Sequence, residues 1–526
     1  MIFKMSCRVL FCRVIWGLFL LFAGFIAPLT AQNQVRDPEK SDFVPQLKAL
    51  SAARMTGRET GTDGGRMASN FIAEYQRQIG LQPMSDDFFQ PFEVIRYRYS
   101  QAKFELLPAQ KTSDPMTFRF EEDFTLIPCQ KSFSATADVV FAGYGMISPD
   151  SVYNDFRGLE VNGKIVMVLE GYPGESDTIG MIYLLYGKPM RQKGEGLEAQ
   201  KRNAMHYGAS ALILLKAHDN SLSTIEWFQS LNGQVPENYP DWRHLLASDS
   251  VTKCIPVFAV GEQGSERLSG SSRKELAAGI CEPNAKKRKN PKPLRVHLEA
   301  VSQQETFEGY NVIGLIRGNN SSRCVVIGGH YDHLGQRGDS IFFGADDNAS
   351  GASGVLALAK KWKESGIRPA VDLIFANWDG EEKCLLGSRA FVGSLNQYYS
   401  TVVGYINMDM ISRSEAADTA ARIVSVGLKS ADSLLNRFVV EANQHLPRPL
   451  MLDIWNASGH SGSDYGPFLN AGYPILTFFT GFHDDYHSPR DRFEKIDSEK
   501  MEDILALVNR CIQYFEKLSR PAKVLD

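Results

Sequence analysis

A chain of 526 residues is longer than one hydrophobic core usually supports, so two domains or one domain with a large insertion are expected. The hydrophobic fraction of 43% and the charged fraction of 22% are those of an ordinary globular protein. The formal net charge of −4 gives no electrostatic basis for binding nucleic acid or an anionic membrane surface.

Residues 1–31 have the composition of an export signal. Basic residues precede an uncharged apolar run from Val14 to Ala27, and the segment ends at Ala31, a small residue suited to cleavage. The run is short for a membrane span, which needs about 20 residues. We therefore expect a cleaved signal, no stable membrane insertion afterwards, and a periplasmic or extracellular protein that begins at Gln32. An uncleaved membrane anchor is the alternative.

Residues 32–133 are expected to begin the main domain. A glycine-rich turn at 57–65 precedes a helix that should start after Thr62 or Asp63 and end before Gly80. The period of this helix is carried by apolar residues that recur every four positions, namely Met67, Phe71, Tyr75 and Ile79. The pattern predicts a packing helix without a chemical role.

Residues 134–295 are predicted to form an inserted domain without chemistry of its own. Apolar runs within 139–145, 163–169, 211–215 and 255–260 predict strands, and no cluster of histidines and carboxylates accompanies them. The spacing from Gly158 to Lys164 is that of a phosphate loop, but Ile165 replaces the Ser or Thr and a strand follows instead of a helix. The basic, proline-containing stretch 286–293 is interpreted as a linker back to the main domain.

The region 325–410 contains short apolar runs that end in histidine or acidic residues. The polar residues that follow these runs are His330, Asp332, His333, Glu381, Glu382 and Asp409. Such runs predict buried, mostly parallel strands, and ligand sites collect at the carboxyl ends of such strands. Histidine with Asp and Glu, and without Cys, is the ligand set of a zinc or related divalent hydrolase site.

Alternating elements continue after residue 410. Strands are predicted at 422–426 and 474–479, and helices at 432–443 and from about 498 to 518. Neither the G-x-S-x-G motif of serine hydrolases nor the H-E-x-x-H motif of zincins occurs in the sequence.

Five motifs, taken in order, resemble those of the co-catalytic di-zinc exopeptidases, a family that includes leucyl aminopeptidases, aminopeptidase Y and glutamate carboxypeptidase. The motifs are His330–His333, Gly344–Gly351, Trp378–Glu382, Asn407–Met410 and Asp485–Pro489. The resemblance covers 47–133 and 296–520, and it implies an α/β fold with a mixed, mostly parallel sheet flanked by helices. Residues 134–295 resemble the protease-associated domain that many members carry at this place, which leaves 296–526 as the main part of the peptidase domain.

The resemblance implies two zinc ions and five protein ligands. His330 and Asp409 would bind one zinc, Glu382 and His487 would bind the other, and Asp347 would bridge both. Two metals that share a carboxylate polarise a scissile carbonyl and make hydroxide from water near neutral pH.

The resemblance also implies roles for residues that do not bind zinc. Glu381 would be the general base that later protonates the leaving amine, Asp332 would orient His330, and Tyr486 would stabilise the oxyanion. The peptide bond Asp347–Asn348 is expected to be cis. Three further histidines lie in the motif loops without an implied metal: His333, His460 and His483. A substrate contact is considered for each of them.

We therefore expect an exported zinc exopeptidase that acts on peptide substrates, and within this class an aminopeptidase. A carboxypeptidase on the same scaffold stays open, because the residues that would bind the substrate's α-amine or α-carboxylate lie in loops without a motif. A glutaminyl cyclase, which uses one zinc, is a second alternative, and a receptor-like binding protein without metals is a third. A ligand set for two bridged zinc ions argues against the cyclase, which uses one zinc. The complete set of five ligands argues against the metal-free receptor.

Overall fold

The structure is a computed structural model, and it describes residues 35–108, 113–127, 132–175, 177–192, 196–216, 223, 227–228, 243–248, 255–278, 280, 293–460 and 462–519. The predicted export signal and almost all of the predicted linker at 286–293 lie outside the described residues. Within these ranges, none of the helices has the length and apolar character needed to cross a membrane.

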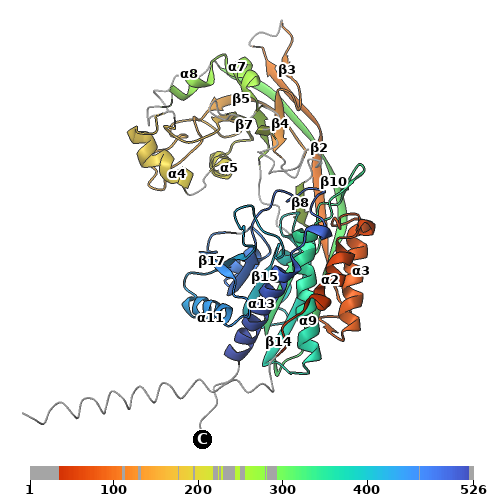
Figure 1. The fold of residues 1–526 in the computed structure, drawn as a ribbon. Helices are drawn as coiled ribbons and strands as arrows, with labels where there is room; N and C mark the ends of the chain where they lie inside the picture. Colours follow the sequence, from red (N-terminus) through yellow and green to blue (C-terminus); the bar gives the residue numbers. More distant parts are fainter. Residues whose placement is uncertain are drawn as a thin grey trace, which may run out of the picture.

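Two long antiparallel strands connect the two lobes of the molecule (Figure 1). Strands β2 (Phe89–Leu107) and β10 (Leu294–Ile316) pair along most of their length, with one bulge at Ser100 of β2, opposite Val301 and Ser302 of β10. Strand β10 also pairs with β14 at one end and with β5 at the other, so a single sheet passes from lobe to lobe. We call the lobe that contains β14 the main lobe and the lobe that contains β5 the second lobe.

The main lobe is built on a mixed, mostly parallel sheet. Its strands, in spatial order from the outer edge to β10, are β17 (Met451–Asn456), β16 (Ile423–Leu428), β18 (Ile475–Phe479), β15 (Thr401–Met408), β11 (Asn320–His330) and β14 (Val371–Trp378). The neighbours β18, β15, β11 and β14 are all parallel, while β16 and β10 run antiparallel to their neighbours β18 and β14. This is the sheet that the sequence predicts.

Helices cover both faces of this sheet, because successive side chains of each strand point to opposite sides. Val325 and Ile327 of β11 pack in a core with α2 (Lys40–Leu50), α3 (Asp63–Gln78), α9 (Gly351–Glu364), α11 (Ser433–Gln444) and α13 (Ser498–Leu518). The intervening Val326 packs on the other side with α10 (Leu386–Leu395) and α12 (Tyr465–Asn470). Short strands β1 (Gln82–Pro83), β12 (Gln336–Arg337) and β13 (Ser340–Ile341) complete the main lobe.

Helix α3 has the predicted ends, and its predicted apolar side packs on the core. Thr62 caps it by accepting a hydrogen bond from the Gly65 amide, and Gly80 follows it with a positive φ of 79°. Met67 is 41% exposed, but Phe71, Tyr75 and Ile79 pack against the core, and Ala68 and Ile72 beside them are fully buried.

The second lobe has a sheet of its own around β5 (Phe133–Phe141), β6 (Ile165–Leu169), β7 (Ala211–Leu215) and β9 (Val257–Val260), which are parallel neighbours. The other elements are β3 (Met116–Phe118), β4 (Phe124–Ile127), β8 (Arg243–Leu246), α4 (Lys188–Gln192), α5 (Leu197–His206), α7 (Glu262–Ser269) and α8 (Arg273–Ala278). Its core also contains Phe104, Phe118 and Phe124, which precede residue 134. Strand β8 pairs with β2, and its Leu246 packs with Leu386 of the main lobe.

Candidate metal centre and active site

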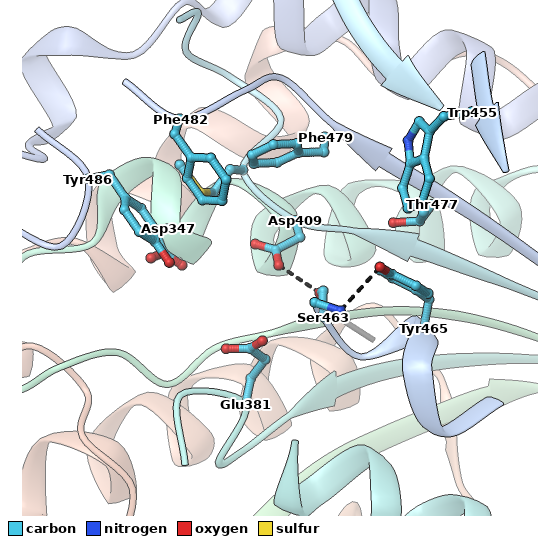
Figure 2. Close-up of a pocket in the computed structure, with 12 residues that line it drawn as sticks. Asp347, Glu381, Asp409, Trp455, Ser463, Tyr465, Thr477, Phe479, Phe482 and Tyr486 are labelled. Carbon is cyan, nitrogen blue, oxygen red and sulfur yellow. Dashed lines mark hydrogen bonds between the residues drawn. The ribbon is translucent and has the colours of Figure 1, made fainter. Parts of the chain in front are cut away.

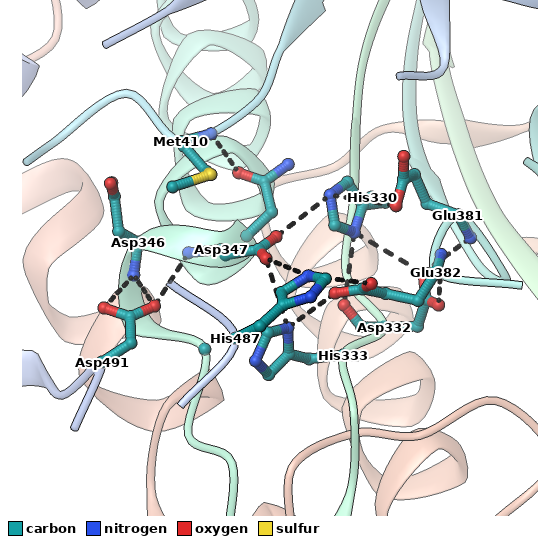
Figure 3. A network of polar contacts seen from close by, with 12 residues as sticks. His330, Asp332, His333, Asp346, Asp347, Glu381, Glu382, Met410, His487 and Asp491 are labelled. Atoms are coloured by element: carbon teal, nitrogen blue, oxygen red, sulfur yellow. Dashed lines mark hydrogen bonds and ion pairs between the residues drawn. The ribbon is translucent and has the colours of Figure 1, made fainter. Parts of the chain in front are cut away.

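Three parallel strands end at one edge of the main sheet, and the predicted ligands follow these ends. His330 is the last residue of β11 and lies opposite Trp378, the last residue of β14. Asp409 comes directly after β15, and the turn with Glu381 and Glu382 comes shortly after β14. Figure 3 shows the resulting cluster of imidazole and carboxylate groups.

The first part of the cluster is formed by His330, Asp409 and Asp347. The Nε2 atom of His330 lies 3.3 Å from Asp409 Oδ1 and 3.5 Å from Asp347 Oδ1. Bonds of about 2.1 Å to a tetrahedral zinc ion place two ligand atoms about 3.4 Å apart. The spacing of these three side chains therefore fits ligands of one metal ion.

The second part of the cluster uses the other oxygen of Asp347. The Nε2 atom of His487 lies 3.2 Å from Asp347 Oδ2 and 3.2 Å from Glu382 Oε2. This nitrogen is buried, yet it has no hydrogen-bond partner among the described residues, so it points between the two oxygens and not at either of them. A metal ligand would have this orientation, and the five predicted ligand residues thus come together in an arrangement that fits two zinc ions.

The electrostatics of the cluster call for cations. Burial opposes the positive charge of His330, but the carboxylates of Glu381 and Asp409 outweigh it and raise the pKa of His330 well above its usual value. Burial likewise opposes charge on His487, yet Glu382 and Asp347 raise its pKa to about 10. Without metal the two imidazoles hold protons, which metal binding must displace.

The two adjacent glutamates have opposite environments. Burial raises the pKa of Glu381 well above its usual value, and the charges of Asp409 and Glu382 act in the same direction. Burial also opposes the charge of Glu382, but His487 and a hydrogen bond with His333 outweigh it and hold the pKa of Glu382 well below its usual value. Groups whose surroundings separate their pKa values in this way are suited to different tasks.

Asp332 contacts His330 of the first part of the cluster and the backbone of Glu382 of the second. Its carboxylate accepts hydrogen bonds from the backbone amides of Glu381 at 3.0 Å and Glu382 at 3.3 Å. The Nδ1 atom of His330 lies 3.3 Å from the Asp332 backbone carbonyl oxygen and 3.6 Å from its Oδ1, and Thr60 donates to Oδ2 at 3.1 Å. Asp332 can therefore orient His330, and it also fixes the turn that carries the two glutamates.

Backbone contacts hold the loop that carries Asp347. The peptide bond Asp347–Asn348 is cis, which confirms the expectation. The amides of Asp346 and Asp347 both donate to Asp491, while the Asn348 side chain donates to the Met408 carbonyl. The carboxylate of Asp347 is thereby held between the two parts of the cluster, and the sequence motifs did not single out Asp491 for this role.

Arg58 is a second residue that sequence reasoning missed. It is fully buried and donates to the carbonyl oxygens of Tyr331 at 2.6 Å, Phe343 at 2.7 Å and Gly344 at 2.8 Å. Its guanidinium thus connects the loop that follows His330 to the start of the loop that carries Asp347. The only sequence signal was its place in the glycine-rich turn at 57–65, which carried no chemistry of its own.

His333, for which the sequence raises a substrate contact, lies next to a predicted metal ligand. Its Nδ1 atom lies 2.8 Å from Glu382 Oε1 and 3.7 Å from Asp347 Oδ2, and its side chain is fully buried. In the sequence it stands three residues after His330, in the same loop. His483 lies 3.5 Å from Asp346 through Nε2, and the ring of His460 packs edge-on against Trp455.

A cavity of about 220 Å³ opens beside the cluster (Figure 2). Asp347, Glu381, Asp409 and Tyr486 line it near the ligands. Its other walls are largely aromatic and are formed by Trp455, Tyr465, Phe479 and Phe482. Tyr486 stacks on the ring of His487 at 3.8 Å, so its phenol is held next to the metal cluster.

Residues 311–512 match the sequence profile of peptidase family M28. They form a family M28 peptidase domain. The profile begins in β10 and ends in α13, so it contains all five motifs and every predicted ligand. The predicted family, fold and enzyme class, a zinc metallopeptidase of the exopeptidase type, are thereby confirmed.

Curated relatives of the M28 domain have two kinds of name. A glutamate carboxypeptidase 2 homolog of Caenorhabditis briggsae is 25% identical over an alignment of 572 positions, which covers 93% of this chain and 69% of the relative. A probable leucine aminopeptidase 2 of Aspergillus fumigatus is 31% identical over an alignment of 189 positions, which covers 34% of this chain and 35% of the relative. The chain spans 54% of a second glutamate carboxypeptidase 2 homolog, from Caenorhabditis elegans, and 26% of a probable glutamate carboxypeptidase of Arthroderma benhamiae.

Solved structures resemble the whole chain. The aminopeptidase from Aneurinibacillus sp. strain AM-1 has a TM-score of 0.56 at 19% identity, with 93% of this chain and 96% of that chain covered. BSAP, a zinc aminopeptidase from Bacillus subtilis, has a TM-score of 0.50 at 19% identity, with 91% and 96% covered. At these identities the likeness shows a common fold.

Proposed function

We propose that this M28 peptidase is a di-zinc aminopeptidase that releases residues from the N-terminus of peptides. The observation that carries the proposal is the position of Asp347, whose two carboxylate oxygens face two different sets of ligands beside a cavity. A carboxylate in this position can bridge two metal ions.

Each predicted site residue has a task that its surroundings support. His330 and Asp409 would hold one zinc ion, Glu382 and His487 the other, and Asp347 both. When bound, the two ions would polarise the scissile carbonyl and supply hydroxide near neutral pH.

The remaining chemistry belongs to side chains that line the cavity or support it. Glu381, whose pKa is raised by burial, takes the proton of the attacking water and gives it to the leaving amine. Tyr486 donates its O–H to the oxyanion that develops on the carbonyl oxygen, and Asp332 keeps the Glu381 turn in place.

The charge of the cavity favours an aminopeptidase over the carboxypeptidase alternative. Among the described residues that line it, none is Lys or Arg. A carboxypeptidase needs a cationic side chain for the α-carboxylate of its substrate, and this lining supplies none. The aromatic walls around Trp455 and Phe482 accept an apolar first side chain.

The test of this specificity is a panel of aminoacyl-nitroanilides and N-blocked dipeptides, assayed with zinc and with a chelator. Leucyl and phenylalanyl nitroanilides should be hydrolysed, chelation should stop the reaction, and added zinc should restore it. Cleavage of the blocked dipeptides at their C-termini, with the free-amine substrates untouched, would instead establish the carboxypeptidase.

We further propose that residues 1–31 direct export and are removed, because a basic region, an apolar run and a small terminal residue occur there together. The mature protein would then start at Gln32 in the periplasm or outside the cell. N-terminal sequencing of the exported protein tests this proposal, and a cytosolic protein that retains Met1 would contradict it.

We also propose that residues 134–295 are an inserted protease-associated domain within a peptidase domain made of 32–133 and 296–526. The separate core of the second lobe supports an insertion, and the aromatic residues Phe104, Phe118 and Phe124 would complete that core from outside the insert. Strand β8 of the insert reaches Leu386 near the glutamate turn, so the insert would also support the active site.

A further inference from the structure

His333 is a buried imidazole that no step of the proposed mechanism uses. It lies at the edge of the metal cluster, and Figure 3 shows it next to Glu382 and His487. Its Nε2 atom has no hydrogen-bond partner among the described residues. The hydrogen bond of its ring is made by the other nitrogen, Nδ1, with Glu382.

The two oxygens of Glu382 face different nitrogens at different distances. Oε1 lies 2.8 Å from His333 Nδ1, whereas Oε2 lies 3.2 Å from His487 Nε2. A separation of 2.8 Å is that of a charge-assisted N–H···O hydrogen bond. It is shorter than the spacing of about 3.4 Å expected for two ligand atoms on one tetrahedral zinc.

The position of the hydrogen in the contact between His333 and Glu382 follows from which of the two groups can donate. A carboxylate can only accept, so the Nδ1 atom of His333 must carry the hydrogen in the bond to Glu382. An imidazole nitrogen that carries a proton has no lone pair for a metal. The Oε2 atom, turned toward His487, is the one left for the metal.

The surroundings of His333 hold its ring in this orientation. Its backbone amide donates to the Arg58 carbonyl at 3.3 Å. The ring lies directly on the backbone of Gly344, where an added Cβ would come within 2.5 Å of the ring carbon Cγ. His487 contacts it edge-on, with the ring centres 5.9 Å apart.

We propose that His333 is a positioning residue for the second metal site, which holds Glu382 through Oε1 and directs Oε2 to the metal shared with His487. This inference rests on the di-zinc site of the proposed function. Removing a group that hydrogen-bonds a metal ligand in this way typically lowers metal affinity or activity by about 10- to 100-fold.

The experiment compares His333→Leu with His333→Asn in the full chain. Leucine removes the donor, whereas asparagine keeps an N–H group on Cγ, where the Nδ1 atom of histidine is also attached. His445→Leu is the matched control, because His445 is exposed at the end of α11 and its ring nitrogen Nδ1 lies 2.7 Å from the Glu441 carbonyl oxygen of the same helix. Zinc affinity is measured by chelator competition, and the d–d spectrum of the Co²⁺ form reports the coordination of the sites.

We expect His333→Leu to lower the affinity for one of the two metals by about 10- to 100-fold. His333→Asn and His445→Leu should stay within about threefold of wild type, and the Co²⁺ spectrum of His333→Asn should be unchanged, because the set of metal ligands is the same. Thermal unfolding of the metal-free variants checks that each is folded.

Two results would overturn the inference while leaving the proposed function in place. If His333→Asn loses as much affinity as His333→Leu and its Co²⁺ spectrum changes, His333 is itself a ligand. If both variants bind two zinc ions as tightly as wild type, His333 has no part in the site. Failure of the wild-type protein to bind two zinc ions would instead reject the proposed function.

Discussion

Replacing Glu381 with Gln should separate catalysis from metal binding, whereas Glu382→Ala should not. The nearest contact of Glu381 with a predicted ligand nitrogen is 3.9 Å, to His330 Nε2. Glu382, by contrast, lies 2.8 Å and 3.2 Å from two imidazole nitrogens of the cluster. Gln also keeps the size of Glu381 and the backbone amide that donates to Asp332.

The expected fall in kcat follows from the proposed role of Glu381 as the general base. General acid–base catalysis contributes roughly 10²- to 10⁴-fold in rate, which corresponds to a rise in the activation free energy of about 3–5 kcal/mol. We therefore expect kcat of Glu381→Gln to fall by at least about 100-fold while its zinc content equals that of wild type. Glu382→Ala should lose zinc and activity together, because it deletes a ligand.

Initial rates and metal analysis of the same protein samples test this prediction. Loss of zinc from Glu381→Gln with retention in Glu382→Ala would mean that the two roles are reversed. A fully active Glu381→Gln variant would refute the assignment of the base.

Three further predictions concern other parts of the molecule. Tyr486→Phe should lower kcat by about 10²- to 10³-fold with little change in zinc content, and a change of less than threefold in steady-state assays would exclude an oxyanion contact. Burial raises the pKa of Asp418, but a hydrogen bond from Lys500 at 2.8 Å and backbone amides outweigh it and lower the pKa from 3.8 to about 2. Because the folded-state pKa is depressed, this carboxylate stabilises the fold above about pH 4 by about 2 kcal/mol and loses that effect as the pH falls toward 2. Denaturant titrations should therefore show a deficit of Asp418→Asn that shrinks below pH 4, and a deficit independent of pH would contradict the assignment. Leu246→Ala should cost about 2–5 kcal/mol, because Leu246 is 5% exposed and packs with Leu386 across the lobes, and urea unfolding unchanged from wild type would argue against that contact.

Motifs and periodicity predicted the main sheet because its strands are short apolar runs with polar residues at their ends. The predicted strand at 474–479 corresponds to β18, Ile475–Phe479, and the predicted last helix corresponds to α13, Ser498–Leu518. The ligand set came from the resemblance of the motifs, and the structure brings His330, Asp347 and the other predicted ligands together.

Long-range contacts could not be predicted from these local patterns. Arg58 lies far from Phe343 and Gly344 in sequence, and nothing in its neighbourhood indicates that its guanidinium bonds their carbonyls. His333 has a partner, Glu382, only because parallel strands β11 and β14 end side by side. The second-lobe boundaries stay a prediction, because β2 and β10 each run through both lobes without a break in composition.

Metal stoichiometry of Asp347→Ala, measured beside the wild type, tests the central claim most directly. The account predicts two zinc ions per wild-type chain and weakened binding of both in the variant, because Asp347 Oδ1 faces His330 and Asp347 Oδ2 faces His487. One zinc ion in the wild type, or a variant that loses one ion and binds the other with wild-type affinity, would contradict a carboxylate that bridges two metals.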